Sequence, residues 1–82
     1  MLVPMTRFDR ITADPAILGG KPHIRGLRIS VSMIAEMVAG GKTIDTILDE
    51  YPYLDRDDIH QALSYTAALA DKEYYLDTQR PA

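Results

Sequence analysis

The 82-residue sequence has no cysteine, no tryptophan and no long apolar run. Without cysteine, neither a disulfide nor a zinc–thiolate site can stabilise so short a chain. The two histidines, His23 and His60, form no cluster with metal-ligand spacing. No apolar stretch approaches the ~20 residues that span a bilayer, and no cationic segment precedes an apolar one at the N-terminus. We therefore expect one cytoplasmic domain over residues 1–82, without metal or cofactor.

The charge of the chain is divided unevenly along its length. The net charge is −3, but residues 1–30 carry +3 and residues 31–82 carry −6. The first third suits nucleic acid or another anionic partner, and the remainder suits a cationic protein partner. The alternative is that both parts are solvated surfaces, which is the commoner role of charged residues.

Residues 6–30 are interrupted by proline and glycine, which break helices and mark turns. The alternation of apolar and polar residues over Phe8–Thr12 predicts a short strand, and the pieces on either side of Gly26 predict a small ribbon. The run Gly19-Gly20-Lys21 lacks the spacing of a phosphate-binding P-loop and is followed by Pro22, so it predicts a structural turn. Strands this short need a helical layer or a second copy of the chain to pack against.

Residues 31–76 predict three helices with short connections. Ser30 or Ser32 caps the first helix, since a serine hydroxyl can accept a hydrogen bond from a free backbone N–H. Apolar residues then recur at helical spacing as far as Gly40-Gly41, where glycine permits the left-handed conformation that ends a helix. Thr43 caps the second helix in the same way as the serine caps the first.

The second and third helices are joined through the turn Tyr51–Leu54. Pro52 ends the second helix because the residue before a proline disfavours the α conformation. Asp55 caps the third helix, and Asp58 follows three residues later as a variant of the capping box. The third helix is expected to be about 18–20 residues long. Its predicted buried face comprises Ile59, Ala62, Leu63, Thr66, Leu69 or Ala70, and Tyr74. The pattern predicts a mainly α fold, in which a short N-terminal β element precedes a homeodomain-like helix-turn-helix bundle.

The third helix is the candidate DNA reader. Arg and Gln side chains read base edges in the major groove, and the exposed face of this helix is expected to carry Arg56, His60, Gln61, Ser64 and Tyr65. Three carboxylates in its first turn argue against this role, because phosphates would repel them. They are explained better as caps that complement the helix dipole, which favours a solvated or protein-contacting face for this helix by itself. Phosphate contacts are instead expected from the N-terminal cations Arg7, Arg10, Lys21, Arg25 and Arg28.

The residues Asp57, His60 and Ser64 have the residue types of a catalytic triad. A working triad also needs an oxyanion hole and a sheltered pocket, and an exposed helix face offers neither. We expect no enzymatic activity, and a hydrolase that uses His60 is the last of the hypotheses.

The C-terminal part of the third helix carries two adjacent tyrosines, Tyr74 and Tyr75. Aromatic residues are enriched at binding hot spots, so this pair either anchors a partner or completes and covers the core. Residues 77–82 are expected to form a frayed tail.

The run from Ile11 to Val31 resembles the signature of a bacterial family, domain of unknown function 433. The resemblance rests on Asp14-Pro15, Gly19-Gly20-Lys21-Pro22 and Gly26-x-Arg28-Ile29 in fixed order, and it extends over roughly residues 8–70. Ser30 stands where proline is frequent in the family, which affects only the start of the first helix.

This resemblance implies a small helix-turn-helix protein whose N-terminal β element helps to build a dimer. It also implies an antitoxin of VapB-like type, which silences a toxin with a PIN-like ribonuclease domain and represses its own operon by binding operator DNA. No functional residue of the family is carried over to a position in this chain.

The leading hypothesis is therefore a homodimeric antitoxin and autorepressor. Two third helices would lie about one DNA turn, ~34 Å, apart, with Arg56, Gln61 and Ser64 facing the groove. Four residues are candidates for toxin contacts: Lys72, Tyr74, Tyr75 and Arg80. The acidic metal site that the family implies for the nuclease would admit the cation of Lys72 or Arg80. The alternative is a protein-interaction module of the same fold that does not bind DNA.

Overall fold

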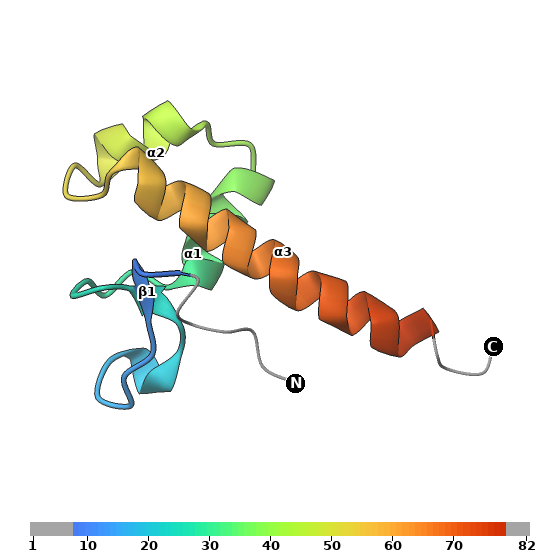
Figure 1. Cartoon of the computed structure of the whole chain (residues 1–82). Helices are drawn as coiled ribbons and strands as arrows, with labels where there is room; N and C mark the ends of the chain where they lie inside the picture. The colour runs from blue at the N-terminus through green and yellow to red at the C-terminus, as the bar shows by residue number, and fades with distance from the viewer. Residues whose placement is uncertain (1–7, 79–82) are drawn as a thin grey trace.

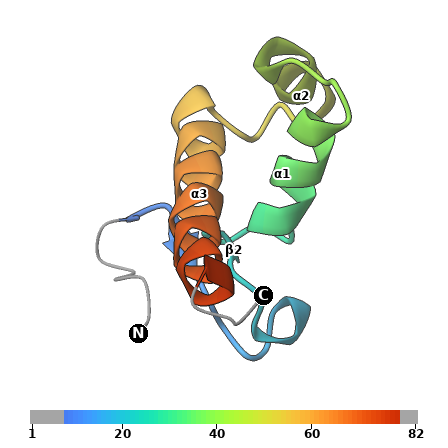
Figure 2. The ribbon, with the colours of Figure 1, turned by 90° about the vertical axis from the view of Figure 1, so that its right-hand side faces the viewer.

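The computed structural model describes the backbone of residues 8–78 and the side chains of residues 8–71. The element order is β1 (Ile11–Thr12), the 3-10 helix η2 (Leu18–Gly20), β2 (His23–Ile24), α1 (Val31–Ala39), α2 (Ile44–Glu50) and α3 (Arg56–Thr78). Figure 1 shows the β element on one side of α1 and α3, with α2 at the opposite end. Figure 2 shows α1 and α3 side by side. The predicted fold is confirmed: a small helical bundle preceded by a short two-stranded sheet.

The two strands are antiparallel and very short. Ile11 lies opposite Ile24, and Thr12 lies opposite His23. The strand predicted over Phe8–Thr12 is thus wrong in its first half, because the backbone N–H of Ile11 donates to the carbonyl of Phe8 at 3.0 Å and closes a turn. The ribbon predicted around the glycine at position 26 is confirmed, since the N–H of Ile24 donates to the carbonyl of Ile29 at 3.0 Å.

The turn predicted at Gly19-Gly20 is formed by the 3-10 helix η2. Leu18, Gly19 and Gly20 all have positive φ values, of 51°, 65° and 88°. Glycine adopts this region without cost, whereas the β-carbon of Leu18 makes it unfavourable there. The chain then returns to the bundle, where the carbonyl of Pro22 accepts a hydrogen bond from the N–H of Val31 at 3.0 Å.

Helix α1 is capped at both ends by residues that the sequence indicates. Of the two candidate serines, Ser30 is the N-cap, and its hydroxyl accepts from the N–H of Met33 at 3.0 Å. At the other end, the N–H of Gly41 donates to Val38 and the N–H of Lys42 donates to Met37, each at 3.0 Å. This is the Schellman arrangement, which satisfies carbonyls at the end of the helix.

The next two helices also begin where predicted. Thr43 caps α2 by accepting from the N–H of Thr46 at 3.1 Å. At the start of α3, the N–H of Asp58 donates to Asp55, and the N–H of Asp55 donates to Asp58, each at 3.0 Å. The reciprocal capping box is therefore present, with aspartate in the place of the usual glutamate.

Helix α3 has 23 residues and continues to Thr78. It is longer than predicted and extends two residues beyond the expected end at position 76. In Figure 1 its C-terminal half projects away from the other elements. Positions 79–82 of the expected tail lie outside the described residues.

The core lies between the β element, α1, α2 and the first half of α3. Its fully enclosed side chains include Ile24, Ile34, Ile47 and Ile59. On α3, Ile59, Ala62, Leu63 and Thr66 are buried or half-buried, as predicted.

Two assignments on α3 are wrong. Tyr65, placed on the exposed face, is 7% exposed and packs edge-to-face on Phe8, with ring centroids 5.2 Å apart. The sequence predicts Leu69 or Ala70 on the buried face, yet Leu69 is 38% exposed and Ala70 is also exposed. The physical reason is that Phe8 of the N-terminal segment covers Tyr65, whereas Leu69 lies one turn further along the same side of the helix, beyond the elements that pack on its first half. The side chain of Tyr74 lies outside the described residues.

Candidate functional site

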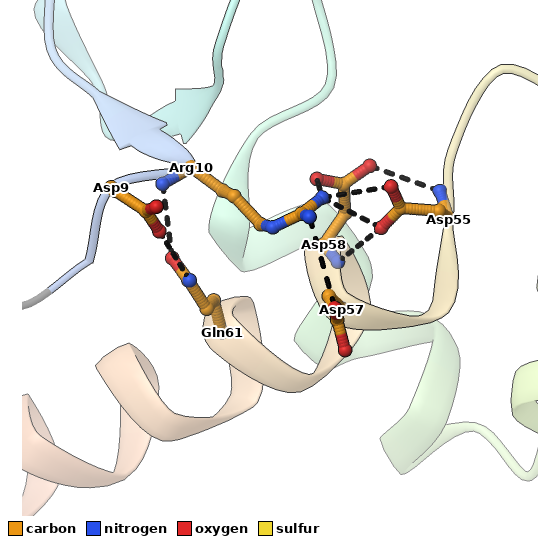
Figure 3. Close-up of polar contacts among 6 residues, drawn as sticks. All are labelled: Asp9, Arg10, Asp55, Asp57, Asp58 and Gln61. Carbon is orange, nitrogen blue, oxygen red and sulfur yellow. Dashed lines mark hydrogen bonds and ion pairs between the residues drawn. The ribbon is translucent and has the colours of Figure 1, made fainter.

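The first turn of α3 holds the guanidinium of Arg10 among three carboxylates (Figure 3). Nη1 of Arg10 donates to both carboxylate oxygens of Asp55 at 2.8 Å and to Oδ1 of Asp58 at 3.0 Å. Nη2 lies 3.7 Å from Oδ2 of Asp57. The side chain of Asp58 is 5% exposed, whereas that of Asp57 is 73% exposed. We call Arg10, Asp55, Asp57 and Asp58 the Arg10 clamp.

A second pair of contacts lies one turn further along α3. The side-chain carbonyl of Gln61 accepts from the backbone N–H of Arg10 at 3.0 Å. The side-chain amide of Gln61 donates to Oδ1 of Asp9 at 2.6 Å. Because Gln61 contacts both a backbone and a side-chain group of the N-terminal segment, it holds that segment on the helix together with the Arg10 clamp.

The clamp changes the acid–base properties of its members. Hydrogen bonds from the Arg10 guanidinium, and then from the N–H of Asp58, hold the pKa of the Asp55 carboxyl below its ordinary value. Hydrogen bonds to Asp55 and Asp58 raise the pKa of Arg10 above that of a free guanidinium. Both changes favour the charged forms, so the clamp is an ion pair at neutral pH.

The residues predicted to read DNA are not gathered on one free surface. Gln61 and Arg10 are both engaged inside the protein, and Arg56 pairs with Asp45 on α2. Ser64 and His60 are exposed on α3. The carboxylates of the first turn thus cap the helix and bind the guanidinium of Arg10. Their negative charge also suits the positive end of the helix dipole.

The remaining predicted phosphate contacts come from the β element and its loop. Lys21, Arg25 and Arg28 are exposed, and none of them has a salt bridge to another described residue. Arg25 is near enough to Asp55 to lower the pKa of that carboxyl through space. These three cations therefore remain available to an anionic partner.

The opposite end of the molecule is acidic. Positions 42–58, which contain α2 and the first turn of α3, have six acidic and two basic residues, a net charge of −4. Lys42 pairs with Glu50, so both local cations of this stretch are already neutralised by neighbouring carboxylates. Asp49 is exposed and has no salt bridge within the described part of the chain.

His23 is a buried polar residue whose role the sequence analysis missed. It is 1% exposed. Its Nδ1 lies 3.0 Å from the carbonyl oxygen of Lys21, and its Nε2 lies 3.0 Å from the hydroxyl of Thr12. A carbonyl only accepts, so Nδ1 carries a proton and the ring ties the loop to β1. No residue pattern around His23 distinguishes it from an exposed histidine, because its partner Thr12 is brought near only by the pairing of β1 with β2.

The candidate triad is not assembled. Asp57, His60 and Ser64 are all exposed, and no hydrogen bond among the described residues joins them. Among the side chains of residues 8–71, no group of three His, Cys, Asp or Glu residues could hold a metal ion. No described helix combines the length and apolar character that crossing a membrane requires.

Five predicted contact residues cannot be placed. Their side chains lie outside the described residues: Arg7, Lys72, Tyr74, Tyr75 and Arg80.

The fold and the clamp define a small three-helix protein whose N-terminal β element is fastened to the start of its third helix. The chain belongs to the DUF433 family of proteins of unknown function, whose model matches residues 11–66. The resemblance carried by the proline- and glycine-containing run is therefore confirmed at the level of the family.

Two known proteins illustrate the likeness. The chain is 40% identical over 58 residues to the uncharacterized protein y4eO of Sinorhizobium fredii (strain NBRC 101917 / NGR234). That match covers 71% of this chain but 26% of the relative, so the chain corresponds to about a quarter of it. A crystal structure of a DUF433 member from Anabaena variabilis ATCC 29413 superposes with a TM-score of 0.73. It covers 92% of this chain and 74% of the other at 24% identity, which supports the shared fold.

Proposed function

We propose that this protein is a cytoplasmic antitoxin that acts by binding and silencing a PIN-like ribonuclease, without catalysing a reaction itself. The observation that carries the proposal is the acidic end formed by α2 and the first turn of α3. Its exposed carboxylates match the positive charge that a ribonuclease presents to RNA. The family resemblance adds support, because it implies such a partner.

The charge of this surface favours a protein partner over DNA. Positions 42–58 have a net charge of −4, and Asp57 and Asp49 are both exposed there. Complementary charge accelerates encounter between proteins and suppresses wrong partners. The same carboxylates would repel the phosphates of a DNA groove, which is the situation of a recognition helix.

The test is inhibition of a PIN-like nuclease, taken from the neighbouring reading frame where that frame encodes one, with RNA cleavage as readout. Asp49→Lys is expected to slow association by about tenfold at low salt and less at high salt. The matched control is Asp14→Lys, the same change at an exposed aspartate in the loop after β1, where, among the described residues, the carboxylate accepts only from the N–H of Ala16. Equal inhibition by wild type and Asp49→Lys would show that the acidic end is not the contact surface. If no neighbouring nuclease is inhibited by the wild type, the antitoxin proposal fails.

A second candidate function is binding of operator DNA, and one observation favours it. Arg25 and Arg28 are exposed on the ribbon and have no salt bridge to a described residue. A ribbon that presents cations is a known way to contact DNA. We place the DNA contact there because the first turn of α3 is acidic and Gln61 is engaged by the N-terminal segment.

Gel-shift titration of the protein with the promoter of its own operon distinguishes DNA binding by the ribbon from DNA binding by α3. Arg28→Glu is expected to weaken binding by at least about tenfold and to reduce its salt dependence. Arg56→Glu, the same change on α3, should have a smaller effect. Loss of binding in Arg56→Glu with none in Arg28→Glu would instead identify α3 as the reader. The absence of salt-sensitive binding, with and without the toxin, would exclude the DNA function.

A further inference from the structure

An apolar groove lies between α1, α3 and the loop that precedes β2. It has a volume of about 410 Å³. Its apolar lining includes Val31 and Ala35 of α1 and Tyr65 and Leu69 of α3. Leu69 is one of the large hydrophobic residues that the described surface exposes. Leu69 is therefore an apolar side chain at the mouth of an apolar groove, and neither is covered by the rest of the described chain.

Two charged residues of opposite sign also line this groove. Lys21 lies on the loop and Glu36 lies on α1, and both are exposed. Neither has a salt bridge to another residue in the described part of the chain. In a two-fold symmetric dimer, every contact occurs twice: if one residue of the first copy touches a second residue of the partner, the second residue of the first copy touches the first residue of the partner. A surface with one free cation and one free anion beside an apolar strip is complementary to itself.

Helix α3 gives a second reason to expect a covering surface. At 1.5 Å per residue its 23 residues span about 35 Å. The last residues of α3 whose side chains are described, Leu69, Ala70 and Asp71, are exposed, and the ribbon of the helix then continues away from the other elements to Thr78 (Figure 1). Contact of another chain with the exposed side chain of Leu69 would cover this part of α3.

We propose that two copies of this chain pair through the groove between α1 and α3. Leu69 of each copy lies in the groove of the other, and Lys21 of each copy meets Glu36 of the other. The self-complementary charges favour a second copy over a different protein. This dimer surface uses neither the acidic end nor Arg25 and Arg28, but it does engage Lys21, one of the three exposed cations of the β element and its loop.

The first test is the mass of the full chain in solution, measured by sedimentation over a wide range of concentrations. The wild type is expected to form dimers. Leu69→Glu should raise the dissociation constant by at least about tenfold while leaving the circular dichroism spectrum unchanged. Ala67→Glu is the matched control, because Ala67 is exposed on the other side of the same helix, and it should dimerise like the wild type. A wild type that stays monomeric at every concentration, or an unchanged Leu69→Glu dimer, overturns the proposal.

The second test changes only two exposed charged side chains, so it leaves the buried core of each variant unaltered. Lys21→Glu and Glu36→Lys should each dimerise more weakly than the wild type, because each places like charges together. Mixed together, the two variants should form heterodimers with about the affinity of the wild type, since opposite charges then meet at both contacts. If mixing gives no preference for the heterodimer, Lys21 and Glu36 do not face each other across the interface. Because the readout is mass, failure here is distinguishable from loss of nuclease inhibition or DNA binding.

Discussion

Nη1 of Arg10 donates hydrogen bonds to both carboxylate oxygens of Asp55, each at 2.8 Å, across 45 positions of sequence. This contact joins the short β element to the first turn of the third helix. The β element has only two residues in each strand, so its own ladder stabilises it little. Its position therefore depends on contacts with α3, of which the Arg10 clamp is the main polar one.

Asp58→Ala should destabilise the protein more than any other single change in the clamp. Asp58 accepts from the N–H of Asp55 and from Arg10 while almost completely buried. Its removal leaves the N–H of Asp55 without its acceptor and leaves Arg10 with the carboxylate of Asp55 but not the buried one, at a cost of about 2 kcal/mol in the free energy of unfolding. Asp57→Ala is the control, since Asp57 is exposed and 3.7 Å from Arg10, and it should change stability by less than about 0.5 kcal/mol. Urea denaturation measures both; equal effects would contradict the role of burial.

The stability of the protein should fall in acid because of Asp55. The pKa of this carboxyl is lower in the folded protein than its ordinary value of 3.8, so near that pH the unfolded chain binds more protons than the folded one. The stabilisation that Asp55 contributes is complete at pH values above the ordinary pKa. It is lost as the pH falls through the lower pKa that the carboxyl has in the folded protein.

Urea denaturation between about pH 6 and about pH 2.5 tests this dependence. In Arg10→Met the decline should be shallower, because the main cause of the lowered Asp55 pKa has been removed. Lys42→Met, which removes the exposed pair with Glu50, is the matched control and should retain the wild-type dependence. A parallel decline in Arg10→Met and wild type would show that the clamp does not couple to folding.

The helices were predictable because their ends are encoded locally. The start of α2 at Thr43, the cap of α3 at Asp55 and the end of α1 at Gly41 each depend on residues within four positions. Proline, glycine and capping side chains act through backbone geometry at their own positions. Such signals are readable without knowledge of the tertiary fold.

The clamp was not predictable for the opposite reason. From the sequence, Arg10 is known only to carry a charge and Gln61 only to be able to form hydrogen bonds. Neither fact indicates which residues are their partners. Their contacts join positions 45 to 52 residues apart. The burial of Tyr65 against Phe8 depends on the same long-range placement. Residues assigned to DNA contacts therefore turned out to hold the N-terminal segment.

Ser30→Ala should destabilise the protein, whereas Ser32→Ala should not. The Ser30 hydroxyl accepts from the N–H of Met33, which otherwise has no partner in the helix. Loss of this cap costs about 1 kcal/mol. Ser32 is exposed, and its hydroxyl contacts only that of Ser30 at 3.1 Å, so its removal should cost less than about 0.5 kcal/mol. Thermal denaturation of the two variants gives the comparison; a larger loss in Ser32→Ala would reassign the cap.

The two glycines at the end of α1 should respond differently to alanine. Gly41 has a φ of +100°, and no heavy atom lies within 4 Å of the place where a β-carbon would be. The cost of Gly41→Ala is therefore conformational, about 1–2 kcal/mol. Gly40 has an ordinary φ of −79°, and its β-carbon would lie 3.3 Å from the carbonyl oxygen of Glu36. A small shift relieves that contact, and the entropy lost by the unfolded chain offsets it, so Gly40→Ala should change stability by less than about 1 kcal/mol.

Urea denaturation of Gly40→Ala, Gly41→Ala and Gly41→Asn decides which glycine ends the helix. Asparagine tolerates positive φ better than alanine does, so Gly41→Asn should lie between the wild type and Gly41→Ala. That order would attribute the end of α1 to the backbone conformation at one position, through which the N–H of Lys42 reaches the carbonyl of Met37 at 3.0 Å. If Gly40→Ala were the more damaging variant, steric contact with the last turn would be the limiting factor, and the Schellman hydrogen bonds would be its consequence.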